Sequence, residues 1–86
     1  MIEKIKNVIE GPLNEIGIMV DSIVYEQEGK NNFLRITIDK ENPITIDDCV
    51  DAAHIINPIL DEHDFIADSY HLEVMSKERG TEDNEQ

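Results

Sequence analysis

The sequence predicts an α+β domain, a two-layer sandwich in which two helices pack on one face of a three-stranded sheet in the order α-β-β-α-β. Three observations support this. Apolar residues recur at helical spacing near the N-terminus and again from residue 49 to 60. They alternate with polar residues over 33–39, as in a half-buried strand, and Gly, Asn or Pro clusters separate the segments.

The first half of the chain is predicted to be a helix followed by a β-hairpin. Residues 2–16 form a kinked helix, since Pro12 removes one helical N–H, with two short helical pieces as the alternative. Gly17 suits the C-cap of this helix because it accepts a positive φ. Strands are expected over 18–28 and 33–39, joined by a turn at Gly29 and its Asn neighbours.

The second half is predicted to be a helix and a third strand. Thr45 is a suitable N-cap, and Asp48 lies three residues later, where its carboxylate favours the helix N-terminus. Pro58 bends the last turn, and a polar break follows over 61–64. The third strand covers about 69–75. Residues 77–86 contain no apolar residue, so we expect a domain over 1–76 and a disordered tail over 77–86.

Helical and strand spacing together predict a mostly aliphatic core. Aromatic residues make up 5% of the chain, and 14 residues are Ile. The residues expected to be mostly buried are Ile5, Ile9, Ile16, Ile36, Ile38, Cys49, Ala53, Ile56, Leu60 and Val74.

The charge restricts the classes of partner. The chain has 86 residues, with 7 Lys and Arg against 20 Asp and Glu, which gives a net charge of −13. Such a chain is repelled by phosphate backbones and attracted to basic proteins.

A single cysteine excludes an internal disulfide. Without a signal-peptide pattern or an apolar run of about 18 residues, we expect a cytoplasmic protein that does not enter a membrane.

The residues that most often perform catalysis or bind metals are poorly placed for either role. Cys49 falls on the apolar stripe of the second helix, next to two carboxylates that oppose a thiolate, which favours core packing over a nucleophile. His54, His63 and His71 lack the i, i+4 spacing of zinc-binding pairs. We therefore expect no enzyme activity, no metal and no cofactor.

The acidic residues around the second helix are the candidate binding site. Their pattern fits neither a calcium loop nor an enclosed acid–base pair. Two interpretations stay open: a solvated surface, or a patch that binds a basic protein. The residues of the predicted patch are Asp47, Asp51, Asp61 and Asp64.

The predicted element order is also that of KH-type RNA-binding modules. Those modules clamp nucleic-acid backbone with a GXXG loop. Here the glycines lie at positions 11, 17, 29 and 80, and no two are three residues apart. Charge and motif together argue against a direct nucleic-acid clamp.

Several segments resemble the N-terminal domain of the ribosome maturation factor RimP family. The strongest is 44–49, Ile-Thr-Ile-Asp-Asp-Cys, which is similar to the start of the family's second helix. The strand Leu34-Arg35-Ile36-Thr37-Ile38 with its Asp39-Lys40 exit and the segment 64–74 are also similar, and the likeness covers about 2–76. Val20-Asp21 resembles the family's first strand with one additional residue before the hairpin, for which a β-bulge near Ser22 would account.

The resemblance ends where the family continues into its second domain. After Val74 the family typically reads Ser-Ser-Pro-Gly and enters a C-terminal Sm-like barrel, whereas this sequence reads Met-Ser-Lys-Glu-Arg-Gly. We expect either an isolated domain or a relative without the barrel. The resemblance implies non-catalytic help in assembling the small ribosomal subunit through contact with a basic ribosomal protein. The alternative is a generic regulatory or ligand-binding α+β domain without a ribosomal role.

Overall fold

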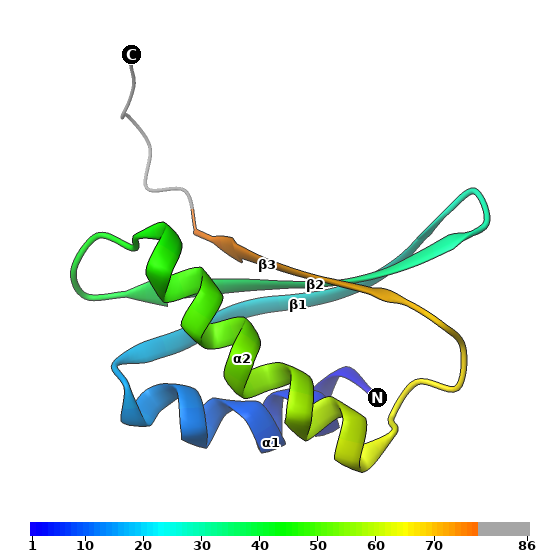
Figure 1. Ribbon diagram of the computed structural model, residues 1–86, viewed down its shortest axis with the longest axis horizontal. Coiled ribbons are helices and arrows are strands. Elements are labelled where there is room, and N and C mark those ends of the chain that lie inside the picture. The colour runs from blue at the N-terminus through cyan, green and yellow to red at the C-terminus, as the bar shows by residue number, and fades with distance from the viewer. Residues whose placement is uncertain (78–86) are drawn as a thin grey trace.

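A computed structural model describes residues 1–77 of the chain. Its helices and strands follow the predicted order. They are α1 (Ile2–Glu15), β1 (Ile18–Glu28), β2 (Asn31–Lys40), α2 (Ile46–His63) and β3 (His71–Ser76). Both helices lie on the same side of a sheet of order β1-β2-β3, with α2 crossing the strands obliquely (Figure 1). The two-layer α+β prediction is confirmed.

The two pairs of strands differ in direction. β1 pairs antiparallel with β2, and the register shifts between Val20 and Ser22, which confirms the predicted bulge. β2 pairs parallel with β3 in a continuous register from Phe33↔His71 to Ile38↔Ser76. Because a parallel pair needs a crossover, α2 carries the chain across the sheet between these strands. This crossover determines which face of α2 is exposed.

The core lies between the helices and the sheet and is entirely apolar among the described residues. Strand β2 contributes alternate side chains to it, Leu34, Ile36 and Ile38, all with no exposed surface. The remaining buried residues come from both helices, β1 and the segment before β3. They are Ile5, Ile9, Leu13, Ile18, Val20, Ala52, Ile56, Leu60 and Ile66.

Four of the residues predicted to be buried are more exposed than expected. Ile16 is 45% exposed because α1 ends at Glu15, so the residue that would continue the apolar stripe is already outside the helix. Gly17, with φ +81°, then turns the chain so that Ile18 enters the core. Cys49, Ala53 and Val74 pack against the core but are only half-buried.

The element boundaries also correct details of the prediction. Helix α1 continues through Pro12, so the alternative of two short helical pieces is wrong. The predicted polar break over 61–64 begins too early, since α2 includes residues up to His63 and ends at Asp64 in the left-handed conformation. Strand β3 starts at His71 rather than at residue 69.

The first residue of the predicted tail, Lys77, continues the backbone pairing of β3 with β2. Lys77, which was assigned to that tail, donates its backbone N–H to the Ile38 carbonyl (2.8 Å) and pairs with Asp21 (3.1 Å). Residues 78–86, the remainder of the predicted tail, lie outside the described residues. No helix within 1–77 is long and apolar enough to cross a membrane.

Candidate functional site

The start of α2 is fixed by a reciprocal cap. The Thr45 hydroxyl accepts a hydrogen bond from the Asp48 N–H (3.2 Å), and the Asp48 carboxylate accepts one from the Thr45 N–H (2.9 Å). Lys40 also contacts Asp48 (3.1 Å). The Thr45 N–H bond, and after it the Lys40 ammonium, hold the pKa of Asp48 below its usual value. Asp48 therefore has a structural role, which separates it from its acidic neighbours.

The outward face of α2 carries three of the four predicted binding residues. Asp47, Asp51 and Asp61 are all exposed. At 100° per residue, Asp51 and Asp61 each lie about 40° from Asp47 around the helix axis, on opposite sides of it, so the three share one face. At about 1.5 Å per residue, the first and last are about 21 Å apart. Asp47 and Asp51 are therefore one pair, and Asp61 belongs to the other end of the helix.

The helix itself contains many acidic residues and no Lys or Arg. Between Ile46 and His63 the sequence has five carboxylates and neither Lys nor Arg. Two exposed apolar residues are sequence neighbours of Asp47 and Asp51 at the N-terminal end of α2. Ile46 is 83% exposed and Val50 is 45% exposed. This part of α2 therefore presents apolar and acidic groups together to solvent.

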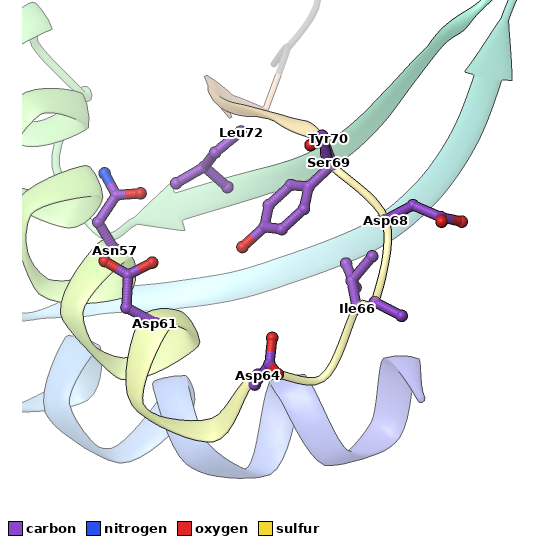
Figure 2. A pocket seen from close by; sticks show the side chains of 9 residues that line it. Asn57, Asp61, Asp64, Ile66, Asp68, Ser69, Tyr70 and Leu72 are labelled. Atoms are coloured by element: carbon purple, nitrogen blue, oxygen red, sulfur yellow. The ribbon is translucent and has the colours of Figure 1, made fainter.

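Asp61 meets Asp64, the fourth predicted residue, at a cleft beside the C-terminal end of α2. The cleft has a volume of about 410 Å³ and is closed on one side by the segment that leads into β3. Figure 2 shows the Tyr70 ring reaching across it toward Asp61. The lining residues are Asn57, Asp61, Asp64, Ile66, Ala67, Asp68, Ser69, Tyr70 and Leu72.

The negative potential of the cleft affects the pKa of the Tyr70 phenol. Burial raises the pKa of Tyr70, and the nearby negative charges of Asp61 and Asp64 raise it further. The same field favours a cationic group in this space. Apolar walls at Ile66 and Leu72 suit the methylene stem of a Lys or Arg side chain.

Sequence reasoning missed part of this cleft. Asp68 and Tyr70 line it but were not among the predicted binding residues. Asp68 continues the acidic run of 61–64 in the sequence, which was an available signal. Nothing local indicates that Tyr70 would face α2, since this depends on how the segment before β3 folds back.

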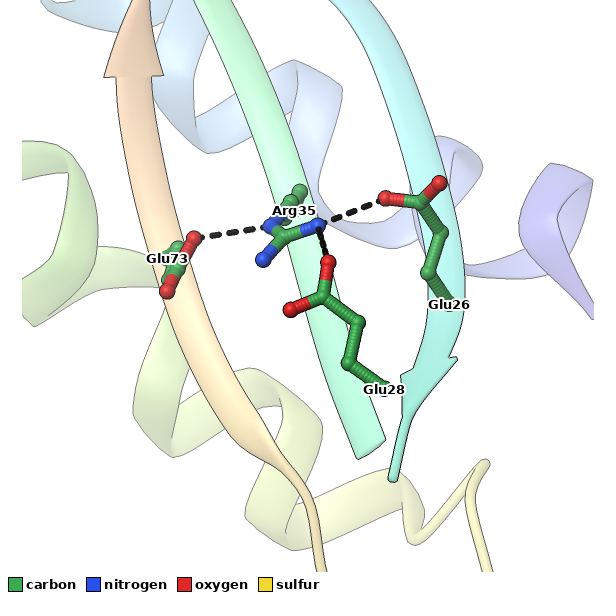
Figure 3. Close-up of polar contacts among 4 residues, drawn as sticks. All are labelled: Glu26, Glu28, Arg35 and Glu73. Atoms are coloured by element: carbon green, nitrogen blue, oxygen red, sulfur yellow. Dashed lines mark hydrogen bonds and ion pairs between the residues drawn. The ribbon is translucent and has the colours of Figure 1, made fainter. Parts of the chain in front are cut away.

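A second group of carboxylates lies on the open face of the sheet and surrounds one guanidinium. Arg35 Nη1 contacts Glu26 (2.7 Å) and Glu28 (2.9 Å), and its Nε contacts Glu73 (2.9 Å), as Figure 3 shows. The hydrogen bond from Arg35, and then its charge, lower the pKa of Glu28. Arg35 on β2 thereby joins carboxylates of β1 and β3. We assign this cluster a role in holding the strands together.

The histidines and the cysteine are not brought together. His63 stacks on Phe65 and His71 lies against Phe33, with ring centroids 5.1 Å and 5.3 Å apart, while His54 is exposed on α2. Cys49 is half-buried against the core. Within residues 1–77, no three His, Cys, Asp or Glu side chains form a group that would hold a metal ion.

Comparison with known proteins identifies the family. Among solved structures, a doubly substituted MamM-CTD is 15% identical, with 92% of this chain and 95% of that chain covered and a TM-score of 0.48. A nickel form of another MamM CTD variant is also 15% identical, covering 88% of this chain and 99% of that one, with a TM-score of 0.45. At such scores the likeness does not extend to function. Residues 8–77, by contrast, match the RimP N-terminal domain, whose family consists of non-catalytic assembly factors. The chain therefore belongs to the RimP N-terminal domain family of ribosome maturation factors.

Proposed function

We propose that this domain assists maturation of the small ribosomal subunit by binding a basic ribosomal protein, with the outward face of α2 as the contact surface. The observation that carries the proposal is the charge of that helix, which has five carboxylates and no Lys or Arg. Family membership supports a partner connected with the ribosome and work in the cytoplasm. Binding alone suffices for this role, and the proposal requires neither catalysis nor a cofactor.

Electrostatics favour protein over RNA as the direct partner. Ribosomal RNA presents a dense array of phosphates, and a chain with a net charge of −13 is repelled by it. Lys- and Arg-rich protein segments experience the opposite force, which speeds their encounter with an acidic surface. The domain would therefore reach the subunit through one of its proteins.

The spacing of the acidic groups indicates the kind of segment that fits. The Asp47–Asp51 pair and the Asp61–Asp64 pair lie at opposite ends of α2, with Asp47 and Asp61 about 21 Å apart along the helix. An extended chain covers about 3.3 Å per residue, so about six residues span that distance. A partner segment with basic side chains at both ends would engage both pairs.

Charge reversal tests the proposal directly. The variant Asp47→Lys with Asp51→Lys changes the charge of the N-terminal pair by +4. We expect its binding to immature small subunits at low salt to weaken about tenfold or more. Binding is measured by co-sedimentation of the full 86-residue chain, with circular dichroism to check the fold.

The matched control carries the same charge change elsewhere. Glu3→Lys with Glu15→Lys places it on α1, where both side chains are exposed. This control should bind within about threefold of the unmodified chain, because distant surface charges are screened. Equal losses in the two variants would indicate a general charge effect, and no loss in the first would exclude this face of α2 as the contact.

A further inference from the structure

The two edges of the sheet differ in how open they are to another strand. Because the order is β1-β2-β3, one side of β1 and one side of β3 have no neighbouring strand among residues 1–77. β1 carries the bulge between Val20 and Ser22, a device that disrupts regular pairing along an edge. β3 pairs with β2 without a register shift. The outer side of β3 is therefore more regular than that of β1 and better suited to pair with an additional strand.

The backbone groups on that outer side follow from the alternation of a strand. Lys77 directs its N–H to the Ile38 carbonyl of β2. Alternate residues of β3 face the same way, so Glu73 and Met75 also direct their backbone groups to β2. Those of Leu72, Val74 and Ser76 then point to the open side, where no strand within residues 1–77 pairs with them.

The start of this open edge adjoins the acidic cleft. Leu72 belongs both to β3 and to the cleft lining, opposite Asp61 of α2. Figure 2 shows Leu72 and Tyr70 on the strand side, with Asn57 and Asp61 facing them from α2. Leu72 and Val74 are only half-buried, so their side chains retain surface for a further contact. Unpaired backbone, apolar surface and negative charge thus occur side by side.

We propose that the outer edge of β3 accepts an extended, basic segment as a fourth strand, with one Lys or Arg side chain of that segment entering the cleft. Strand addition of this kind obtains affinity from main-chain hydrogen bonds and specificity from pockets for side chains. The occupant is basic because three carboxylates, Asp61, Asp64 and Asp68, line the cleft. This proposal rests on the proposed function, since it names how the basic partner of α2 docks.

The test uses a defined probe, an acetylated and amidated ten-residue peptide in which Lys alternates with Val, and the full 86-residue chain at low salt. Amide hydrogen exchange is measured by NMR with and without saturating peptide. We expect exchange at Leu72, Val74 and Ser76 to slow about tenfold or more, because these N–H groups acquire partners. Glu73 and Met75 serve as internal controls and should change little.

A pair of variants tests the cleft. Asp61→Asn with Asp64→Asn keeps the shape of the side chains and should weaken peptide binding about threefold or more. Glu3→Gln with Glu15→Gln removes the same charge from α1 and should leave binding nearly unchanged. Absence of peptide binding, unchanged exchange along β3, or equal losses in both variants would overturn the proposal.

The outcome is separable from that of the proposed function. The same exchange measurement is repeated with immature small subunits in place of the peptide. A chain that binds subunits while Leu72, Val74 and Ser76 exchange at their free rates would overturn strand addition and leave the subunit contact intact. A chain that does not bind subunits would contradict the proposed function itself.

Discussion

Thr45 and Asp48 cap each other across the first turn of α2, with two hydrogen bonds of 2.9 Å and 3.2 Å. This exchange satisfies backbone donors that would otherwise lack partners at the helix start. It also fixes the direction in which the helix leaves the loop after β2. The positions of Asp47 and Asp51 on the outer face depend on that direction.

Removal of the cap should lower the stability of the domain. Thr45→Ala deletes the hydroxyl acceptor, and we expect the free energy of unfolding to fall by about 1 kcal/mol. Thr45→Ser retains the acceptor and should stay close to the unmodified chain. Urea denaturation monitored by circular dichroism measures both. Equal stability of the two variants would show that the cap contributes nothing measurable.

The same contact predicts a dependence of stability on acid. The pKa of Asp48 is lower in the folded chain than in the unfolded chain, first because of the Thr45 N–H bond and then because of Lys40. Its contribution is therefore complete above about pH 4, the ordinary range of an Asp carboxyl, and is lost as the pH falls through the lower folded value.

Asp48→Asn should reduce the slope of unfolding free energy against pH below about pH 4. Part of the slope should remain, because Arg35 lowers the pKa of Glu28 in the same sense. Urea titrations at a series of acidic pH values measure the slope. A slope identical to that of the unmodified chain would contradict the role assigned to Asp48.

Two isoleucines test where the core ends. Ile56 has no exposed surface, so Ile56→Ala should cost about 2–5 kcal/mol of unfolding free energy. Ile16 is 45% exposed, and Ile16→Ala should cost less than about 1 kcal/mol. Denaturation of both variants by urea compares them under one set of conditions. A loss below about 0.5 kcal/mol for Ile56 would mean that this face of α2 does not fill the core.

The C-cap residue that follows α2 is a position where glycine should be favourable. Asp64 adopts φ +51°, and its N–H bonds to the Leu60 carbonyl at the helix end. Asp64→Gly should raise the unfolding free energy by up to about 1 kcal/mol, since glycine has no Cβ to strain this conformation. Asp61→Gly, one turn earlier inside the helix, should lower it by about 1 kcal/mol. Thermal unfolding gives both signs, and a loss of stability for Asp64→Gly would contradict this reading of the cap.

Local sequence signals predicted much of this fold. The span 18–28 of β1 and the Thr45–Asp48 cap agree with the structure. The bulge near Ser22 agrees as well, but the family resemblance predicted it, not a local signal. Ile16 was placed wrongly because apolar spacing does not indicate where a helix ends. Helix α1 ends at Glu15, one residue before the predicted end at residue 16. The cleft was missed because it forms between the end of α2 and a segment that folds back to β3. The sequence pattern predicted Asp61 and Asp64 as binding residues, but it did not predict that Tyr70 would line the same cleft.

The central claim is that this acidic domain binds a basic protein of the small subunit and not its RNA. The dependence of the association rate constant on salt concentration tests this claim most directly. Stopped-flow fluorescence with the labelled 86-residue chain and immature small subunits measures it across ionic strengths. Attraction between α2 and a basic protein predicts that association slows as salt rises, because salt screens the steering field. An association rate that stays constant or increases with salt would contradict the claim, since an increase is the behaviour of two surfaces that repel each other.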